Sequence, residues 1–208
     1  MITALLLFAA TSAVDAERAF AADAQKIGQW TAFRKYADDT AVMFTTQAVW
    51  AHEFLKGRED PPKSVEWWPA LSLVSCDGRT AVNSGPAFRE GKHYGQFTTA
   101  WVQEKGTWKW VYDNGSAPVG KPTPKPAKPK VTRASCRGKA PGAPIIQPLP
   151  LTEREARKTP NDSGRGESAD KTLGWDWKVA KNGEHHFRVY LWNGRGYHEA
   201  LNVHVSGQ

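Results

Sequence analysis

Few residues in this sequence combine acid–base or metal-binding chemistry with a suggestive spacing. His52 follows Trp50 by two residues in a segment predicted to be a strand, so the two side chains share one face. If that face lines an interior, His52 could act as an acid, a base or a ligand-orienting group, with Asp39 as its carboxylate partner. If it lies at a rim, His52 is simply solvated. The sequence shows no evident catalytic constellation, and His52 and Asp39 are the candidates that it offers.

Four histidines cluster near the end of the chain: His185, His186, His198 and His204. The first two point to opposite faces of a predicted strand, and we expect no Cys or carboxylate beside them at zinc-ligand spacing. We therefore predict no metal site and no cofactor, and expect a cross-strand pair of imidazoles on the solvated face. The sequence also has no Gly-rich phosphate loop and no Ser nucleophile elbow.

Large aromatic side chains alternate along two predicted strands. Phe97 and Trp101 share a face with Thr99, and Trp108, Trp110 and Tyr112 share a face of the next strand. Such rings form either the buried core of a sheet or the wall of a ligand pocket. The pocket candidates are Phe44, Trp50, His52, Phe97, Trp101 and Tyr112.

The elements that must position these residues are two helices followed by a strand-rich region. Asp15 is a candidate N-cap for the first helix, and Gly28 separates it from the second. Pro61 and Pro62 open a predicted helix that runs to Ala70. The predicted strands are 41–44, 48–54, 71–76, 79–83, 94–104 and 107–113.

This order of elements, with the stretch 36–42 (YADDTAV) and the strand end 110–113 (WVYD), resembles the nuclear-transport-factor-2-like superfamily. That group includes the ketosteroid isomerases and the SnoaL-like polyketide cyclases. The resemblance covers about residues 17–115 and implies an α+β cone, in which a curved antiparallel sheet wraps the helices and leaves a pocket. It also implies a homodimer formed through the sheet.

The catalytic positions of the isomerases do not carry over to this chain. The general base lies five residues after the second Asp of the YADD stretch, where this sequence has Phe44. The oxyanion-donating Tyr of the first helix falls on Phe20 or Ala21. None of these side chains can take a proton or donate a hydrogen bond, so isomerase chemistry at those positions is excluded.

The first residues are typical of an export signal. Residues 2–10 (ITALLLFAA) are apolar, and small residues at 11–13 and 14–16 could satisfy a cleavage site, although no Lys or Arg precedes them. The alternative is the apolar first turn of a buried helix. We predict a signal over residues 1–16 and a periplasmic or secreted protein. In such a compartment Cys76 and Cys136 could pair; otherwise they are two unrelated small residues.

The net charge of +7 arises from one segment of the chain. Residues 114–152 contain seven Lys or Arg and no acidic residue, and 117–150 contain nine prolines. We predict a basic, extended linker over 116–152, which is either a solvated spacer or a tether to an anionic envelope surface. It has no aromatic residue for base stacking, so no nucleic-acid partner is expected. No apolar run is long enough to span a membrane.

After the linker, residues 153–208 form a predicted small antiparallel β module. Its strands are 173–180, 184–192 and 197–205, and the turns between them are Asn182-Gly183 and Asn193-Gly194. Three strands of this size need a partner surface. The domain organisation is thus a signal (1–16), an α+β domain (17–115), a linker (116–152) and a β module (153–208).

These features favour an exported, non-catalytic protein that binds a small apolar or aromatic molecule, or a protein partner, through its Trp-rich first domain. One alternative is an enzyme of the isomerase, dehydratase or cyclase type with relocated catalytic groups. Another is a structural envelope protein held by its basic linker.

Overall fold

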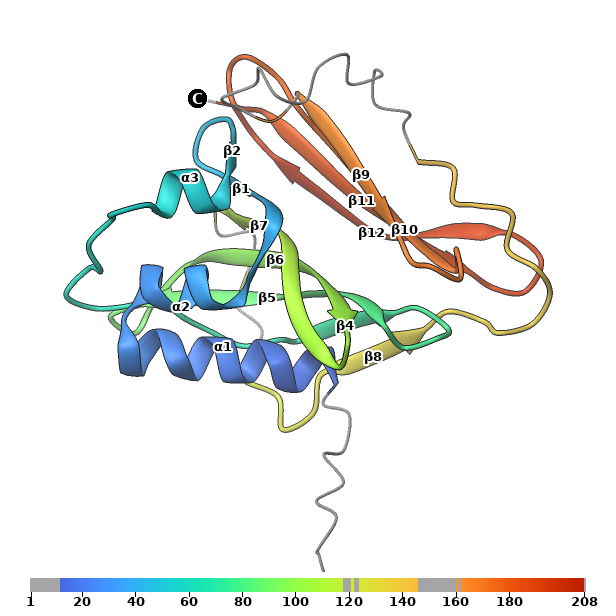
Figure 1. The fold of residues 1–208 in the computed structure, drawn as a ribbon, viewed down its shortest axis with the longest axis horizontal. Helices are drawn as coiled ribbons and strands as arrows, with labels where there is room; N and C mark the ends of the chain where they lie inside the picture. Colours follow the sequence, from blue (N-terminus) through green and yellow to red (C-terminus); the bar gives the residue numbers. More distant parts are fainter. Residues whose placement is uncertain (1–11, 118–120, 122–123, 146–159, 161, 208) are drawn as a thin grey trace, which may run out of the picture.

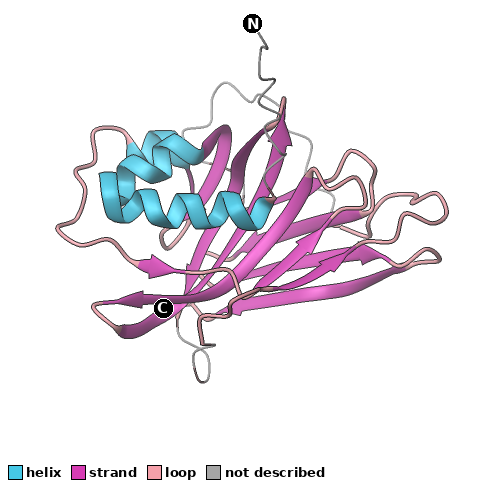
Figure 2. Cartoon of the chain, turned by 90° about the horizontal axis from the view of Figure 1, so that it is seen from below, coloured by secondary structure: helices cyan, strands magenta, loops and turns pink. Residues whose placement is uncertain are grey.

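The computed structural model describes residues 12–117, 121, 124–145, 160 and 162–207. In this part of the chain, helices pack against one face of a curved eight-stranded sheet, and a four-stranded antiparallel sheet packs against the other face (Figure 1). Figure 2 shows the helices lying along the sheet from a second direction. The predicted α+β class is confirmed. No helix among the described residues is long and apolar enough to cross a membrane.

The helices are α1 (Ala13–Ile27), α2 (Gln29–Tyr36) and α3 (Ala51–Leu55). The larger sheet consists, in pairing order, of β2 (Ala48–Trp50), β1 (Ala37–Phe44), β7 (Thr107–Ser116), β6 (Lys92–Glu104), β5 (Thr80–Arg89), β4 (Leu71–Val74) and β8 (Lys130–Arg133), with β3 (Glu66–Trp67) paired to β5. The smaller sheet consists of β12 (Tyr197–Val205), β11 (His185–Trp192), β10 (Leu173–Val179) and β9 (Ser163–Glu167). Because β1 pairs with β7 and β4 with β8 in parallel, the larger sheet is mixed rather than purely antiparallel.

The first helix begins earlier than predicted. Ser12 is its N-cap and forms a capping box with Asp15, which stands at the third helical position rather than at the cap. The first turn is anchored in the core, since Ala13 and Ala16 are buried. Helix α1 therefore includes residues 13–16, which the sequence prediction assigned to the export signal.

Two predicted elements between α2 and β4 are wrong. The segment 48–54 is not one strand, because β2 ends at Trp50 and α3 begins at the next residue. No helix follows Pro62; the chain is extended there and forms β3. Contacts from the helices hold this segment, since the Gln29 side chain accepts a hydrogen bond from the Val65 amide and the Trp67 indole donates to Glu17. Tertiary contacts thus override the local helix signal.

A bulge in β7 decides which way its side chains face. Trp110 pairs with Trp101 and Tyr112 pairs with Ala100, so Val111 is an extra residue in the strand. Trp108 and Trp110 consequently face the helices, whereas Tyr112 faces the smaller sheet. The prediction that these three aromatic residues share one face is therefore wrong for Tyr112.

The smaller sheet covers the outer face of the larger one. Trp175, Trp177 and Val179 share one face of β10, as predicted, and pack in the layer between the sheets. Tyr112 stacks on Phe187 at 4.2 Å between ring centroids. The sheet face through which a homodimer was expected is thus covered by the chain's own C-terminal sheet.

The basic segment after the first domain is partly folded. Strand β8 extends the larger sheet beside β4, and Ala134, Ala140 and Ile145 are buried. The prediction of an unpacked linker is therefore wrong for these residues. Because β8 is an edge strand, its Lys130 and Arg133 protect an exposed edge from further pairing.

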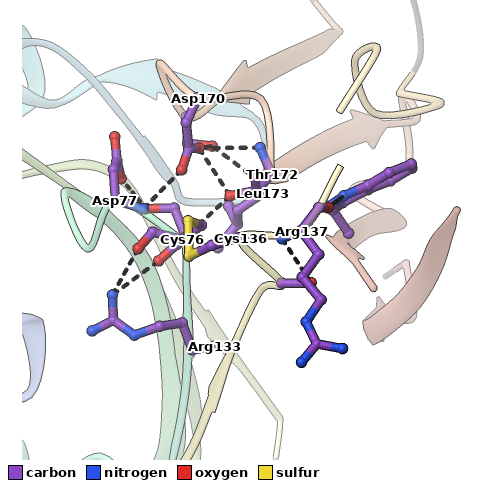
Figure 3. The surroundings of a disulfide bond; sticks show 12 residues. Cys76, Asp77, Arg133, Cys136, Arg137, Asp170, Thr172 and Leu173 are labelled. Atoms are coloured by element: carbon purple, nitrogen blue, oxygen red, sulfur yellow. Dashed lines mark hydrogen bonds between the residues drawn. A yellow bond between two sulfur atoms is a disulfide. The ribbon is translucent and has the colours of Figure 1, made fainter. Parts of the chain in front are cut away.

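A disulfide between Cys76 and Cys136 joins the end of β4 to the segment after β8 (Figure 3). Around it, the Arg133 guanidinium donates to the carbonyl of Cys76 at 3.0 Å, and the Asp170 carboxylate accepts from the Asp77 amide at 2.7 Å. The Thr172 hydroxyl accepts from the Cys76 amide at 2.8 Å. This junction therefore connects the larger sheet, the linker and the turn that precedes β10.

Strand β9 was not predicted, and its glycines explain how it fits. Gly164 and Gly166 pair with Trp177 and Trp175 of β10, whose indole rings lie over the glycine positions. Neither glycine has a positive φ, so space rather than backbone conformation requires them.

We predict that Gly166→Ala lowers the free energy of unfolding by about 1–3 kcal/mol, because the new Cβ would overlap the Trp175 ring. At a strand position with no neighbouring ring, the same substitution would stabilise the strand slightly, because alanine loses less conformational entropy on folding than glycine. Urea unfolding followed by tryptophan fluorescence measures the loss. Lys178→Ala, at an exposed position of β10, is the control and should change stability by less than about 0.5 kcal/mol. Equal stability of the two variants would contradict this account.

Candidate functional site

The candidate site is a cavity of about 570 Å³ between α2 and the ends of β5, β6 and β7. Its wall mixes apolar with polar side chains, and the polar ones include Gln29, Arg89 and Asn114. The aromatic rings of the lining come from separate elements: Trp30 and Phe33 of α2, Phe44 of β1, Trp67 of β3, and Tyr94 and Phe97 of β6. A cavity of this size suits a small organic molecule.

Asp113 is the carboxylate among the described lining residues. It pairs with Thr99 on β6 and with Met43 on β1, and the bulge at Val111 turns it to the helix side of the sheet. The Thr99 hydroxyl donates to its carboxylate at 2.8 Å. Burial raises the pKa of Asp113 to about 7, against the lowering effect of the Thr99 hydrogen bond. This carboxyl can therefore exchange a proton near neutral pH.

Glu17 of α1 is a second buried carboxyl, adjacent to the cavity wall. It is fully buried and accepts hydrogen bonds from the indoles of Trp67 at 2.8 Å and Trp101 at 2.7 Å, and from the Asn83 amide at 3.3 Å. Burial raises its pKa to about 7; the indole hydrogen bonds lower it, and the charge of Asp113 raises it further. Since Trp67 also lines the cavity, Glu17 is a positioning residue for this part of the wall.

The six predicted pocket residues are not brought together. Phe97 lines the cavity; Phe44 also borders it, although its ring packs against Tyr112 and Trp177 between the sheets. Trp101 is buried in the core and does not line the cavity. The others lie elsewhere: Tyr112 and Trp50 belong to the layer between the sheets, and His52 is on α3.

His52 and Asp39 come close to each other but do not line the cavity. The Nε2 atom of His52 lies 3.9 Å from Oδ1 of Asp39, whose side chain is fully exposed. The expectation that His52 shares a strand face with Trp50 is wrong, because the chain turns into helix α3 at Ala51. Surface pairs of this kind contribute little energy.

Sequence reasoning missed Asp113, which is the last residue of the strand predicted over 107–113. In the structure β7 continues to Ser116, so Asp113 is inside the strand. Its partner Thr99 does lie on the predicted Phe97–Trp101 face. This polar residue on an aromatic face was the feature of the sequence that could have indicated a polar partner there. Strict alternation along β7 would have placed Asp113 on the opposite face, because the bulge is not visible in the sequence.

At the position of the isomerase oxyanion donor, Phe20 is fully buried and contacts the rings of Phe33 and Trp67 at 4.8 and 4.9 Å. This side chain fills the core and offers no donor. Hydrogen bonding in this region is instead carried by the indole groups bound to Glu17.

The histidines of the smaller sheet do not line the cavity. His185 points inward and stacks on Phe44 at 4.7 Å, and burial lowers its pKa to about 4. His186 and His204 form the expected cross-strand pair, with rings stacked at 4.3 Å. Contrary to expectation, a carboxylate lies beside them: Oε1 of Glu184 is 3.0 Å from Nε2 of His204.

Comparison with known proteins gives structural similarity alone. No family model and no curated protein matches the sequence. A protein of unknown function from the DUF3225 family of Pectobacterium atrosepticum is similar, with a TM-score of 0.40 and 16% identity, over 51% of this chain and 88% of its own. The hub homology domain of CamKII from Chlamydomonas reinhardtii has a TM-score of 0.37 and 18% identity, over 53% and 100% of the two chains. A proposed aromatic ring hydroxylase from Novosphingobium aromaticivorans has a TM-score of 0.38 and 13% identity, over 52% and 89%. Values this low carry no argument about function.

We predict that Glu17 makes the protein less stable as pH rises. A carboxyl whose pKa is higher in the folded state, about 7 against 4.5, stabilises the fold below pH 4.5, and this contribution is lost as pH rises to about 7. In Glu17→Gln the slope of unfolding free energy against pH should become less negative by up to about 1.4 kcal/mol per pH unit. Urea unfolding between pH 5 and pH 8 measures the slope.

The control for this experiment is Glu104→Gln, which removes an exposed acid at the end of β6. It should keep the wild-type slope. If Glu17→Gln also keeps that slope, Glu17 is ionised in the folded protein throughout this range and the assignment is wrong.

Proposed function

We propose that this chain is an exported, non-catalytic member of the nuclear-transport-factor-2-like superfamily that binds a small apolar or aromatic molecule in its cavity. The observation that carries the proposal is the cavity itself, which has an aromatic wall and a carboxyl group, Asp113, in its lining. A pocket that combines apolar and aromatic side chains with specific polar groups is the usual form of a small-molecule site.

The wall of the cavity is preorganised for binding. Phe33 makes edge contacts with Trp30 at 5.4 Å and with Trp67 at 6.0 Å, and the Trp67 indole is fixed by its hydrogen bond to Glu17. Rings held in this way lose little conformational entropy when a ligand binds. Aromatic faces and edges favour a flat, apolar ligand.

The residues at the family's catalytic positions argue against isomerase chemistry at those positions. Such chemistry needs a base together with a donor that stabilises the developing anion. Asp113 could act as a base, but its described hydrogen-bond partner is Thr99, and the family's two catalytic positions are occupied by Phe44 and by Phe20 or Ala21. Binding without turnover is the function that this arrangement supports best.

Export is supported by the disulfide between Cys76 and Cys136, since such bonds persist in oxidising compartments. The capping box at Ser12 argues against the predicted cleavage sites, because cleavage after Ala13 or Ala16 would remove this cap from α1. The tether alternative has less support, because part of the basic segment pairs with β4 and is buried.

We predict that the neutral aromatic probe N-phenyl-1-naphthylamine binds in the cavity and that Ala87→Leu weakens this binding by at least about tenfold, or about 1.4 kcal/mol. Ala87 lines the cavity, and the added carbon atoms would occupy ligand space. Probe fluorescence measures the affinity. Ala140→Leu is the matched control, since both alanines are 7% exposed and Ala140 does not line the cavity.

The control variant should bind the probe as the wild type does, with the folding of both variants checked by thermal melting. Equal affinity of Ala87→Leu and wild type would place the probe elsewhere and refute the cavity assignment. His52→Ala should also leave binding unchanged, because His52 lies outside the described cavity lining.

A second candidate function, an enzyme with a relocated base, is favoured by the pKa of about 7 at Asp113. For a binding protein we predict that affinity for the neutral probe falls as pH rises through 7, since a neutral apolar probe would have to displace water from the ionised Asp113 carboxylate. In Asp113→Asn this pH dependence should disappear while affinity at pH 5 is retained. Turnover of a substrate by the wild type, abolished in Asp113→Asn, would instead establish the enzyme.

A further inference from the structure

Three side chains with metal-ligating atoms converge on the exposed face of the smaller sheet, outside the candidate cavity. They are Glu184, His186 and His204, which we call the Glu-His-His cluster; their ligating atoms all lie within 4.8 Å of one another. The cluster stands beside the turn between β10 and β11, at the end of the sheet where the chain finishes (Figure 1). Nothing in the proposed ligand-binding function uses these residues.

Strand pairing brings the three residues together. His186 and His204 are directly opposed on the antiparallel strands β11 and β12, so their rings emerge side by side on one face. The Asn182-Gly183 turn, with Gly183 at φ 82°, reverses the chain and leaves Glu184 just before β11. The Asn182 side chain accepts a hydrogen bond from the Glu184 amide at 3.1 Å and fixes this approach.

The orientation of the cluster is set by the core. His185 between Glu184 and His186 points inward, is 3% exposed and stacks on Phe44. Because alternate residues of a strand face opposite ways, this buried histidine directs His186 outward. The two outer rings are nearly parallel, with 4° between their planes, and both Nε2 atoms approach the same carboxylate.

The two separations between the Glu184 carboxylate and the imidazoles are close to those in the first coordination shell of a transition metal. Oε1 of Glu184 lies 3.0 Å from Nε2 of His204 and 3.6 Å from Nε2 of His186. In a tetrahedral zinc site with bonds near 2.1 Å, neighbouring ligand atoms are about 3.4 Å apart. The side chains are about half exposed, with relative accessibilities of 41% for Glu184 and 50% for each histidine, so an ion can enter from solvent.

The cluster is more than a single surface ion pair. Exposed pairs contribute at most about 1 kcal/mol, and here two imidazoles share one carboxylate oxygen. A cation bound between the three groups would use a lone pair from each. The neighbouring Lys178, which pairs with His186 across β10 and β11, is a positive charge that opposes such binding.

We propose that the Glu-His-His cluster binds a divalent transition-metal ion, with zinc as the representative, through one carboxylate and two imidazoles. Imidazole and carboxylate together suit zinc, copper or nickel and do not suit magnesium. Three protein ligands leave a fourth position open to water or to a group from another molecule, as in non-structural zinc sites. The fold does not require the ion, because the sheet is held by its own core.

The test is calorimetric titration of chelator-treated, untagged full-length protein with Zn²⁺. We expect one ion per chain, no comparable heat with Mg²⁺, and visible absorption bands of tetrahedral geometry when Co²⁺ replaces Zn²⁺. His186→Ala and His204→Ala should each weaken Zn²⁺ binding by at least about tenfold, and the double variant should abolish it. Glu184→Gln, which keeps the side-chain size, should weaken it as well.

His198→Ala is the matched control, because His198 is exposed on β12, the strand that also contains His204, and lies outside the cluster. It should bind Zn²⁺ as the wild type does. Zn²⁺ should raise the melting temperature of the wild type and of this control but not that of the double variant, whose fold is checked by near-ultraviolet circular dichroism.

Three results would overturn the proposal. One is the absence of stoichiometric Zn²⁺ binding by the wild type. Another is wild-type affinity in the folded double variant, which would place the ion elsewhere. The third is an equal loss of affinity in His198→Ala, which would indicate non-specific binding to surface histidines.

Discussion

The extra residue at Val111 in β7 is the constraint on which both halves of the molecule depend. Before the bulge, Trp108 and Trp110 face the helices; after it, Tyr112 faces the smaller sheet and Asp113 returns to the helix side. A regular strand would bury Asp113 between the two sheets without Thr99 and would remove Tyr112 from its stacking partner. One inserted residue thus supplies an aromatic anchor for the sheet-on-sheet layer and a carboxyl for the cavity.

The elements that the sequence predicts well are those specified by local chemistry. Gly28 separates α1 and α2, and the turns at Asn182-Gly183 and Asn193-Gly194 lie between paired strands, because glycine readily adopts the positive φ observed at each. The alternation of Trp175 and Trp177 is equally local, since it reflects one buried face of one strand.

The elements that it misses depend on partners distant in sequence. Strand β8 forms because β4 presents a free edge, and β9 forms because its glycines accommodate the indoles of β10. The cavity is hidden for the same reason: Thr99, Asp113 and Trp67 come from three strands whose register the sequence does not show. Of the predicted pocket residues, those that reach the cavity, Phe44 and Phe97, do so from separate strands.

The buried polar groups show how a Trp-rich core can still specify one structure. Glu17 accepts hydrogen bonds from two indoles. Neither the Trp67 ring nor the Trp101 ring can therefore turn over without losing its hydrogen bond to this carboxyl group. The cost is a carboxyl held in an apolar interior, which is visible in its raised pKa. A core of tryptophans without this group would pack by shape alone, and flat rings allow several arrangements of similar energy.

The smaller sheet completes the first domain rather than following it as an independent module. An open curved sheet with Leu73, Val82, Ala100 and Tyr112 on its outer face would expose a large apolar surface, and a four-stranded sheet with Trp175 and Trp177 on one face would do the same. Each covers the other, and the disulfide at Cys136 together with the Cys76–Thr172 hydrogen bond fastens the two at one end. The face that could otherwise pair with a second copy is thereby filled within one chain. This packing leaves open the cavity on the helix side and the outer face of the smaller sheet, the two surfaces for which binding is proposed.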